Sequence, residues 1–521
     1  MEFISIFNDV LGPVMRGPSS SHTAGSFHIG TMARSLMNNK ISSVTFTFDP
    51  SGSYAQVYRQ QGVDLAFAVG IMGRKLTDEI FFDALNIAAR QGIDIKFTIA
   101  PIKMTDHPNT VVIDICSPKK DKLQAVAKSV GGGVIRFTRL DDWEIELTGK
   151  AYEIVVICSD TVEPRVKKLL TSDGQTNAET ETRGQQGKIM VTACRKSPLP
   201  VEIENQIRKL VGVRQFHAVA PVYYVKKGET LFSSAAEMVA LTKENGFSLG
   251  QVALDYEAQL LGLSNEAALK EMMRRFEIMK ESVTTGLMDE KVRMQLLDPT
   301  AGKISKAEAE KRLAIGGLHT RAAFRAMAAM HQNNSMGVVC AAPTGGSAGV
   351  LPGVVVTLAE EKKLSAKESA MALFAASAIG LIVARRATFA AEVAGCQVEI
   401  GAAGAMATAA VVEVAGDNAA DAADAAAIAF QNTMGSVCDL VQGMCEIPCH
   451  TRNAVAASSA FVCADLILGG YVNPIPLDET IDAVYSVGKM LPPELRCTTL
   501  GGLAVTPSAL SLKKKNIKQK F

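Results

Sequence analysis

The residues best suited to chemistry are cysteines in the last third of the chain. Cys438, Cys445 and Cys449 fall in one short stretch, and Cys396 lies upstream of them. Thiolates are soft ligands, and clustered thiolates favour zinc or an iron–sulfur cluster. The spacing is neither that of a zinc ribbon with two Cys-x-x-Cys pairs nor that of a ferredoxin. From the pattern alone, a metal site and a set of inert buried cysteines both stay open.

A second group of polar side chains follows a Gly-Pro turn near the N-terminus. It consists of three serines, a histidine and a threonine, namely Ser19, Ser20, Ser21, His22 and Thr23. The group precedes a predicted helix at 26–37, so its hydroxyls and the backbone N–H groups of the helix start suit a carboxylate or a phosphate. Serine and threonine also favour helix N-termini for local reasons, so a plain N-cap turn is the alternative.

Two further segments suit a ligand. The segment Ala-Pro-Thr-Gly-Gly-Ser-Ala-Gly at 342–349 is built of small residues that let a ligand approach the backbone. It fits a phosphate cradle for a pyridoxal cofactor or a tight turn between helices. His107 and Asn109 stand in a turn before a predicted strand at 110–115, and a purely structural histidine is the alternative there.

Three regions of different pattern must position these residues. Residues 1–150 alternate strand and helix patterns, and strict alternation at 43–48 is typical of a half-buried strand, which predicts an α/β or α+β domain. Residues 227–521 have helical periodicity and become rich in alanine, the best helix former, which predicts an all-α domain.

The middle region, residues 151–226, predicts a ferredoxin-like unit. Its expected order is βαββαβ, which is the order of that fold. The expected elements are strands at 154–158, 178–182, 188–193 and 215–224 and helices at 163–171 and 200–210.

Composition limits the classes of protein that need considering. The chain has 521 residues with a net charge of +1, which predicts several folded domains and makes a nucleic-acid partner unexpected. Ten cysteines are too few for a disulfide scaffold of this size. No secretory signal is visible, and the apolar stretches 370–383 and 454–472 are predicted as buried helices rather than membrane spans. We therefore predict a cytoplasmic protein without a membrane partner.

Taken in chain order, the four segments resemble the iron–sulfur-dependent L-serine dehydratases, or L-serine ammonia-lyases, over nearly the whole chain. The Ser-Ser-Ser-His-Thr loop and the His-Pro-Asn turn resemble the β portion of that family, and the middle unit resembles the ACT domain that some members append. The 342–349 loop, Gly-Cys-Gln-x-Glu and Cys-Asp…Pro-Cys-x-x-Arg-Asn resemble the α portion. The resemblance implies a single-chain β–ACT–α fusion with domains at 1–150, 151–226 and 227–521.

The resemblance also implies a chemistry. A [4Fe–4S] cluster held by Cys396, Cys438 and Cys449 would leave one iron free to bind the β-hydroxyl of L-serine as a Lewis acid. A base would remove the α-proton, giving pyruvate and ammonia without pyridoxal phosphate. The implied catalytic residues are His22, His107 and Ser20. The implied substrate contacts are Ser19, Ser20, Ser21, His22, Thr23, Asn109, Thr344, Arg452 and Asn453. Arg452 and Asn453 could also orient the cluster.

The sequence departs from the family at positions that bear on the substrate. After an expected strand at Gly-Ser-Tyr-Ala, Gln61 stands where relatives carry a histidine, and an amide cannot transfer protons at neutral pH. Gly345 replaces an asparagine, and Cys497 stands where relatives usually lack a cysteine. These departures leave open a lyase for another β-substituted amino acid, such as L-cysteine or L-threonine, and a non-catalytic amino-acid sensor.

Two further expectations concern the cofactor and the assembly. A pyridoxal-dependent deaminase is the less favoured alternative, because no lysine lies in a recognisable cofactor motif. The helical core and the sheet edges of the middle unit predict a homodimer.

Overall fold

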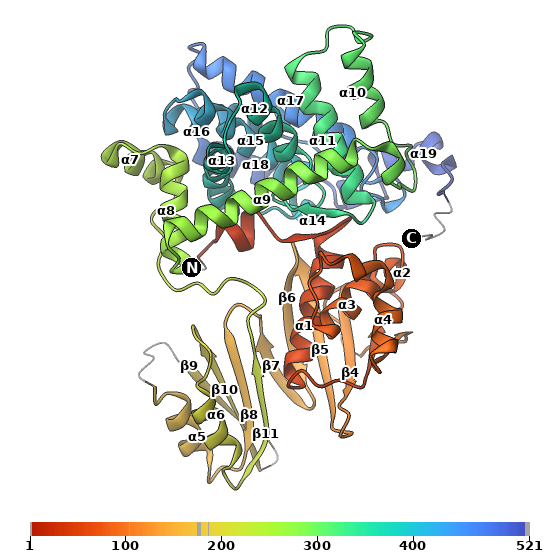
Figure 1. Ribbon diagram of the computed structural model, residues 1–521, viewed down its shortest axis with the longest axis vertical. Coiled ribbons are helices and arrows are strands. Elements are labelled where there is room, and N and C mark those ends of the chain that lie inside the picture. Colours follow the sequence, from red (N-terminus) through yellow and green to blue (C-terminus); the bar gives the residue numbers. More distant parts are fainter. Residues whose placement is uncertain (1–2, 104, 174–178, 186, 516–521) are drawn as a thin grey trace. The chain divides into compact units, whose positions relative to one another are not determined.

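The computed structural model describes residues 3–103, 105–173, 179–185 and 187–515, and the chain divides into two compact units. Unit 1 comprises Met1–Ser20 and Gly228–Phe521, and unit 2 comprises Ser21–Lys227. The division falls inside the Ser-Ser-Ser-His-Thr loop. The predicted combination of N-terminal α/β sheets and a helical C-terminal region is confirmed (Figure 1). The predicted boundaries at residues 150 and 226 stay a prediction.

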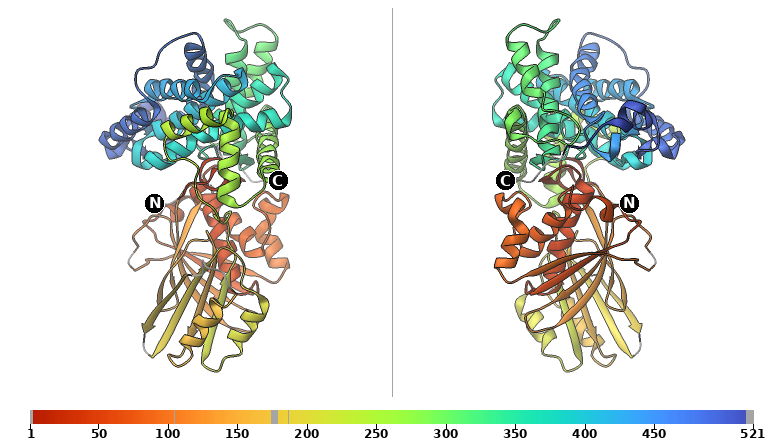
Figure 2. Two further views of the ribbon diagram at one scale, coloured as in Figure 1. Left: turned by 90° about the vertical axis from the view of Figure 1, so that its left-hand side faces the viewer. Right: turned by 90° about the vertical axis from the view of Figure 1, so that its right-hand side faces the viewer.

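Unit 2 contains a six-stranded sheet in the order β3-β2-β4-β5-β6-β7. Strands β2 and β3 run parallel, and the other neighbours are antiparallel. Helices α1 and α3 pack together beside this sheet (Figures 1 and 2). The elements are α1 Gly25–Leu36, β2 Ser43–Phe48, α2 Ser53–Val57, α3 Val63–Met72, η3 Glu79–Asp83, α4 Ala84–Arg90, β3 Asp94–Ile99, β4 Thr110–Cys116, β5 Lys122–Gly131, β6 Val134–Leu140 and β7 Trp143–Leu147.

Strand β2 and helix α3, which lies beside the sheet, both follow from their local sequence. Strand β2 alternates half-buried and buried side chains as predicted, and the ring of Phe46 stacks on that of Phe67 with centroids 4.2 Å apart. Helix α3 is buried along its whole length and is flanked by Gly62 and Gly73, both in the left-handed region. Glycine reaches that conformation without steric cost, so it favours these helix boundaries. Strand β5 was not predicted, because its alanines weaken the alternation.

The second sheet of unit 2 has four antiparallel strands in the order β11-β8-β10-β9. The predicted βαββαβ order is present, and both helices cover one face of the sheet (Figure 1). Residue 178, the predicted start of the second strand, lies outside the described residues. The elements are β8 Tyr152–Cys158, α5 Glu163–Leu170, β9 Glu179–Gln185, β10 Lys188–Arg195, α6 Val201–Arg208 and β11 Val213–Val219.

Unit 1 is an assembly of helices, which Figure 2 shows from two sides. Its core is rich in alanine. Its longer helices are α7 Ala235–Asn245, α8 Leu249–Leu261, α9 Asn265–Gly286, α10 Ala301–Ala309, α11 Leu318–Asn334, α12 Val350–Lys362, α13 Ala366–Arg386, α15 Ile400–Ala415, α16 Ala419–Thr433, α17 Cys449–Leu468 and α18 Leu477–Met490. Its short elements are η1 Ile6–Val10, β1 Val14–Arg16, η4 Asp289–Lys291, β12 Val338–Cys340, α14 Ala391–Ala394, η5 Cys396–Val398, β13 Cys438–Asp439, η6 Val441–Gly443, η7 Pro493–Leu495, β14 Arg496–Thr498, η8 Gly502–Val505 and α19 Pro507–Ser511; η2 Ser20–Ala24 bridges both units.

Two helices of unit 1 are long and apolar enough to cross a membrane by length and composition, Ala366–Arg386 and Cys396–Ala415, but 78% of each apolar window is buried inside the structure. The prediction of a buried helix at 370–383 is confirmed. The prediction for 454–472 is only half right, because α17 ends at Leu468 and one of its faces is exposed at Val455, Val462 and Leu466.

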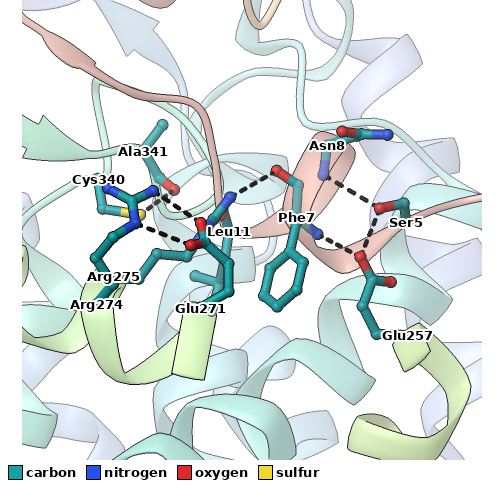
Figure 3. A network of polar contacts seen from close by, with 10 residues as sticks. All are labelled: Ser5, Phe7, Asn8, Leu11, Glu257, Glu271, Arg274, Arg275, Cys340 and Ala341. Atoms are coloured by element: carbon teal, nitrogen blue, oxygen red, sulfur yellow. Dashed lines mark hydrogen bonds and ion pairs between the residues drawn. The ribbon is translucent and has the colours of Figure 1, made fainter. Parts of the chain in front are cut away.

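The N-terminal segment is anchored within unit 1 by a buried carboxylate (Figure 3). Glu257 of α8 accepts hydrogen bonds from Ser5 Oγ at 2.6 Å, from the Ile6 N–H at 2.7 Å and from the Phe7 N–H at 2.9 Å. Arg275 of α9 donates to Leu11 O at 2.7 Å. Strand β1 then pairs with β12, so the chain leading to Ser19 and Ser20 is fixed on the helical core.

Candidate functional site

Five cysteines of unit 1 gather in one place, and we call them the thiol cluster: Cys396, Cys438, Cys445, Cys449 and Cys497. The predicted ligands Cys396, Cys438 and Cys449 are all buried. Ligand atoms of Cys396, Cys438 and Glu399 lie within 4.8 Å of one another. The structure therefore brings two predicted ligands together with a carboxylate, and Cys449 interacts electrostatically with both Cys396 and Glu399.

Separate elements position the thiols. Cys396 opens η5 after Gly395, where an added Cβ would lie 2.6 Å from Ser436 O, so the turn requires glycine. Cys438 lies on β13, whose parallel partner β14 carries Cys497. Cys449 is the first residue of α17.

Crowding and burial raise the pKa of two of these thiols, those of Cys438 and Cys449. The neighbouring thiols of Cys396 and Cys497, together with burial, raise the pKa of Cys438. The thiol of Cys445 and burial raise the pKa of Cys449 well above its usual range. Adjacent buried thiols cannot all ionise without a counter-charge, and a bound cation supplies one because ligand thiolates bind it in the deprotonated form. The donor set thus fits a soft metal centre.

A cationic side chain lies beside this cluster. Arg452 Nη1 donates to Cys396 Sγ at 3.7 Å and to Val437 O at 2.8 Å, and its Nη2 lies 3.0 Å from Asp439 Oδ1. The guanidinium is therefore held between the buried carboxylate of Asp439 and the thiol of Cys396, a predicted ligand.

The 342–349 loop contacts the cluster through Glu399. The Thr344 hydroxyl donates to Glu399, and a Cβ added at Gly346 would lie 2.5 Å from Glu399 Oε1. Burial raises the pKa of Glu399 to about 7. Sequence reasoning missed this residue, although it stands one helical turn after Cys396 in the Gly-Cys-Gln-x-Glu segment.

Asn453 ties the same loop to Cys449. Its Oδ1 accepts the Gly349 N–H at 3.1 Å, and its Nδ2 donates to Gly346 O at 2.9 Å and to Cys449 O at 2.8 Å. The amide of Asn453 is thus engaged by the backbone on both sides. These bonds fix a proposed ligand relative to the loop.

Unit 2 holds a second group, which we call the hydroxyl–imidazole cluster: Ser21, His22, Thr23, Ser53, His107, Asn109 and Ser129. His22 Nε2 lies 2.8 Å from Ser53 Oγ, and the Ser53 N–H donates to Pro108 O at 2.9 Å. Ser129 Oγ donates to Ser21 O at 2.6 Å, and the Ser129 N–H donates to Asn109 O at 3.2 Å. The predicted loop and the predicted His-Pro-Asn turn are therefore joined by two serines that the sequence did not single out.

The two imidazoles of this cluster differ in their hydrogen bonds. Burial lowers the pKa of His22 to about 4, so the ring is neutral at neutral pH. His107 Nδ1 accepts the Asn109 N–H at 3.1 Å, which puts the proton of a neutral His107 on Nε2. His22 faces a hydroxyl that can donate or accept, and His107 presents a donor.

Two buried oxygens of unit 2, Asn109 Oδ1 and Gln61 Oε1, have no hydrogen-bond partner within the described part of the chain. Gln61 borders the cluster, because its backbone carbonyl accepts a hydrogen bond from Thr23 Oγ1 at 3.3 Å. Buried acceptors without donors are costly, and a ligand that brings N–H groups would satisfy them.

The remaining predicted residues lie as follows. Ser19 and Ser20 belong to unit 1, where Asn333 Nδ2 donates to Pro18 O at 3.2 Å and to Gly345 O at 3.1 Å. This bond links the chain before Ser19 to the loop that carries Thr344. The expected strand at Gly-Ser-Tyr-Ala is wrong, because Ser53–Val57 forms helix α2, which places Ser53 at a helix start.

A helical unit with a buried thiol cluster, together with an α/β unit that buries imidazoles and hydroxyls, defines a class of multidomain enzymes with a candidate metal centre. The family model described as serine dehydratase alpha chain matches residues 235–504, and the chain belongs to the serine dehydratase family. The predicted family, and with it the prediction of an enzyme, is confirmed.

Relatives cover both portions of the chain. A probable L-serine dehydratase alpha chain of Bacillus subtilis (strain 168) is 36% identical over 285 residues, 55% of this chain and 95% of the relative. A probable beta chain from the same organism is 40% identical over 160 residues, 31% of this chain and 70% of the relative. L-serine dehydratase 2 of Escherichia coli (strain K12) is 31% identical over 288 residues, 53% of this chain and 61% of the relative. Similarity to both an alpha and a beta chain supports the predicted fusion.

Proposed function

We propose that this chain is an iron–sulfur-dependent lyase that deaminates L-serine to pyruvate and ammonia. The observation that carries the proposal is the thiol cluster, in which Cys396, Cys438 and Cys449 come together from three separate elements of the region matched by the family model. The names of the relatives supply the substrate, because they are L-serine dehydratases.

The proposed cofactor is a [4Fe–4S] cluster on Cys396, Cys438 and Cys449. When bound, such a cluster supplies an iron without a cysteine ligand, which acts as a Lewis acid on the β-hydroxyl and improves a poor leaving group. We propose no pyridoxal phosphate, because no lysine of the sequence lies in a recognisable cofactor motif. The buried thiols and the adjacent Arg452 suit the metal instead.

Arg452 and Asn453 act, in this proposal, as positioning residues rather than as substrate contacts. Their hydrogen bonds go to Cys396 Sγ, to Cys449 O and to the backbone of neighbouring loops. Thr344 orients the Glu399 carboxylate next to the ligands. This set holds the donor atoms in place while the metal binds.

The hydroxyl–imidazole cluster supplies the acid–base and recognition groups. His22 accepts the α-proton, and the Ser53 hydroxyl keeps its ring oriented. His107 donates from Nε2, and Asn109 Oδ1, an acceptor without a donor among the described residues, suits the ammonium group of an amino acid. Hydroxyls of the Ser-Ser-Ser-His-Thr loop suit the carboxylate: Ser19, Ser20, Ser21 and Thr23.

A second candidate function is an amino-acid sensor, and one observation favours it. Gln61 replaces the proton-transferring histidine of the family, and its buried Oε1 has no partner within the described residues. In this alternative the βαββαβ unit, which we propose to be ACT-like on its strand order, binds the ligand. The homodimer and the cytoplasmic location stay predictions.

Anaerobic purification tests the proposal, with iron and sulfide counted per chain and pyruvate and ammonia assayed with L-serine in the same sample. Bound iron with L-serine-dependent pyruvate supports it. Bound iron with turnover of only L-cysteine or L-threonine changes the substrate and keeps the lyase. Absence of iron from protein kept away from oxygen contradicts the metal proposal, and amino-acid binding without turnover then favours the sensor.

The Gln61→His variant tests the departure from the family. If the missing imidazole limits the reaction, kcat rises with unchanged iron content. An unchanged kcat shows that Gln61 does not limit the acid–base step.

A further inference from the structure

The thiol cluster holds more cysteines than the proposed ligand set uses. Cys497 is exposed, whereas Cys438 has only 1% of its surface accessible. The two thiols are nevertheless neighbours, because Cys497 is one of the groups whose contact raises the pKa of Cys438. An exposed cysteine beside a buried one can be reached by an oxidant from the solvent.

The backbone places Cys497 beside Cys438. Strands β13 and β14 pair in parallel, with Cys438 opposite Arg496 and Asp439 opposite Thr498, so Cys497 lies opposite the link between Cys438 and Asp439. Neighbouring strands run about 4.8 Å apart, which lies inside the Cα separation of roughly 4.4–6.8 Å that a disulfide requires.

The strand that carries Cys497 is held by contacts that need no metal. Asp439 Oδ2 accepts the Leu503 N–H at 2.7 Å, just beyond β14. Arg496 Nη1 donates to Val393 O at 3.3 Å. The pairing of β13 with β14 therefore persists when the thiols bind nothing.

We propose that Cys438 and Cys497 form a reversible disulfide when the chain carries no metal. Hydrogen peroxide oxidises the thiol of Cys497, the exposed residue of the pair, to a sulfenic acid and releases one water. The Cys438 thiol attacks that sulfur, the S–S bond forms, and the hydroxyl leaves as a second water. Two electrons pass from the thiols to the peroxide, and both thiol protons end in water.

The disulfide has a consequence for metal binding, and this consequence rests on the proposed function. The disulfide itself does not. It withdraws Cys438 from metal binding and protects its sulfur from further, irreversible oxidation. Reduction by a thiol restores both groups, so the chain can be loaded again.

Peptide mapping of the metal-free chain after hydrogen peroxide tests the pair directly. Trypsin combined with a protease that cleaves before aspartate puts Cys438 alone in 424–438 and Cys497 alone in 497–513. A disulfide between these two peptides is expected. A dominant link from 424–438 to 387–416 or to 439–452, or no link at all, overturns the proposal. The mapping needs no iron, so failure of the metal proposal is seen separately.

Reloading with iron gives a second readout. After peroxide and then dithiothreitol, the wild type is expected to regain its iron, and the Cys497→Ser variant to regain several-fold less because Cys438 is lost to irreversible oxidation. The Cys194→Ser variant is the matched control, since Cys194 is also exposed but lies on β10 of unit 2. Equal recovery by all three proteins contradicts the proposal. Loss of iron from Cys497→Ser before any oxidant is added also contradicts it, because Cys497 would then be a ligand.

Discussion

The thiol cluster of unit 1 and the hydroxyl–imidazole cluster of unit 2 both bury reactive groups, but they leave different needs unmet. Neighbouring thiols and burial raise the pKa of Cys438 and of Cys449, and a bound cation would favour their ionised form. In unit 2, burial keeps His22 neutral, and the buried oxygen of Asn109 has no donor among the described residues. A cation satisfies the first cluster, and a small molecule with N–H groups satisfies the second. The difference separates metal binding from substrate handling into two sets of residues that can be tested apart.

The largest effect is expected from a proposed ligand. Cys438→Ala removes a buried thiol from the centre of the cluster, so iron, visible absorbance and activity should all disappear. Iron and sulfide analysis of the anaerobic protein measures this. The matched control is Cys463→Ala, a buried cysteine on α17 outside the cluster, which should keep its iron and lose only about 1–2 kcal/mol of stability to a small cavity. A Cys438→Ala protein that retains full iron contradicts the ligand assignment.

The second prediction breaks the other cluster while leaving the metal in place. His22→Ala removes the imidazole that contacts Ser53, so kcat should fall by about 10²–10⁴-fold with unchanged iron content. Steady-state kinetics on L-serine and iron analysis of the same sample measure both. His28→Gln is the matched control, because burial lowers the pKa of His28 to about 4 as well, but this ring donates to Gly133 O at 2.8 Å outside the cluster. If kcat falls equally in His22→Ala and His28→Gln, the effect of His22 comes from its contribution to the folded structure and not from proton transfer.

The third prediction concerns the carboxylate that sequence reasoning missed. Gly346→Ala places a methyl group 2.5 Å from Glu399 Oε1, so the carboxylate must shift from its position beside Cys396 and Cys438. Displacement of about 1 Å costs roughly 100-fold in rate where a group is precisely needed. Gly404→Ala is the control, since its nearest neighbour is 3.7 Å away and a helix gains stability from alanine. If Gly346→Ala and Gly404→Ala have the same kcat, the position of Glu399 does not matter for the reaction.

Much of the fold follows from local pattern, since side-chain alternation and helical periodicity are properties of consecutive residues. Strand β2 and the βαββαβ order were predicted in this way. Strand β5 was missed because alanine fits strands and helices alike. The exposed face of α17 was missed because composition alone does not say which side of an apolar helix is covered.

The candidate site divides in the same way. The three cysteines were found because their residue type and order are distinctive. Ser53 and Ser129 were missed because their role depends on contacts with residues far away in the sequence, Pro108 and Ser21. Serine is common on surfaces, so nothing local marks those two positions.

The smallest effect is a dependence of the stability of unit 2 on pH. The pKa of His28 is lowered from 6.5 to about 4 by burial, so the unfolded chain takes up a proton below pH 6.5 while the native chain does not until about pH 4. Stability is therefore lost as the pH falls through this window, by about 2 kcal/mol per histidine between pH 7 and pH 5. His28→Gln should show a correspondingly shallower loss, because its amide does not titrate.

The single tryptophan, Trp143, lies on β7 of unit 2 and reports on the unfolding of the unit that contains His28. Urea titrations followed by its fluorescence at pH 7, 6 and 5 give the free energy of unfolding, and hence its slope against pH, for the wild type and for His28→Gln. The comparison is between slopes, because the substitution also changes stability at pH 7 by altering the bond to Gly133. If the free energy of unfolding depends on pH in the same way for the wild type and for His28→Gln, His28 titrates normally in the native chain. The comparison of neutral buried imidazoles with crowded thiols would then no longer hold for His28.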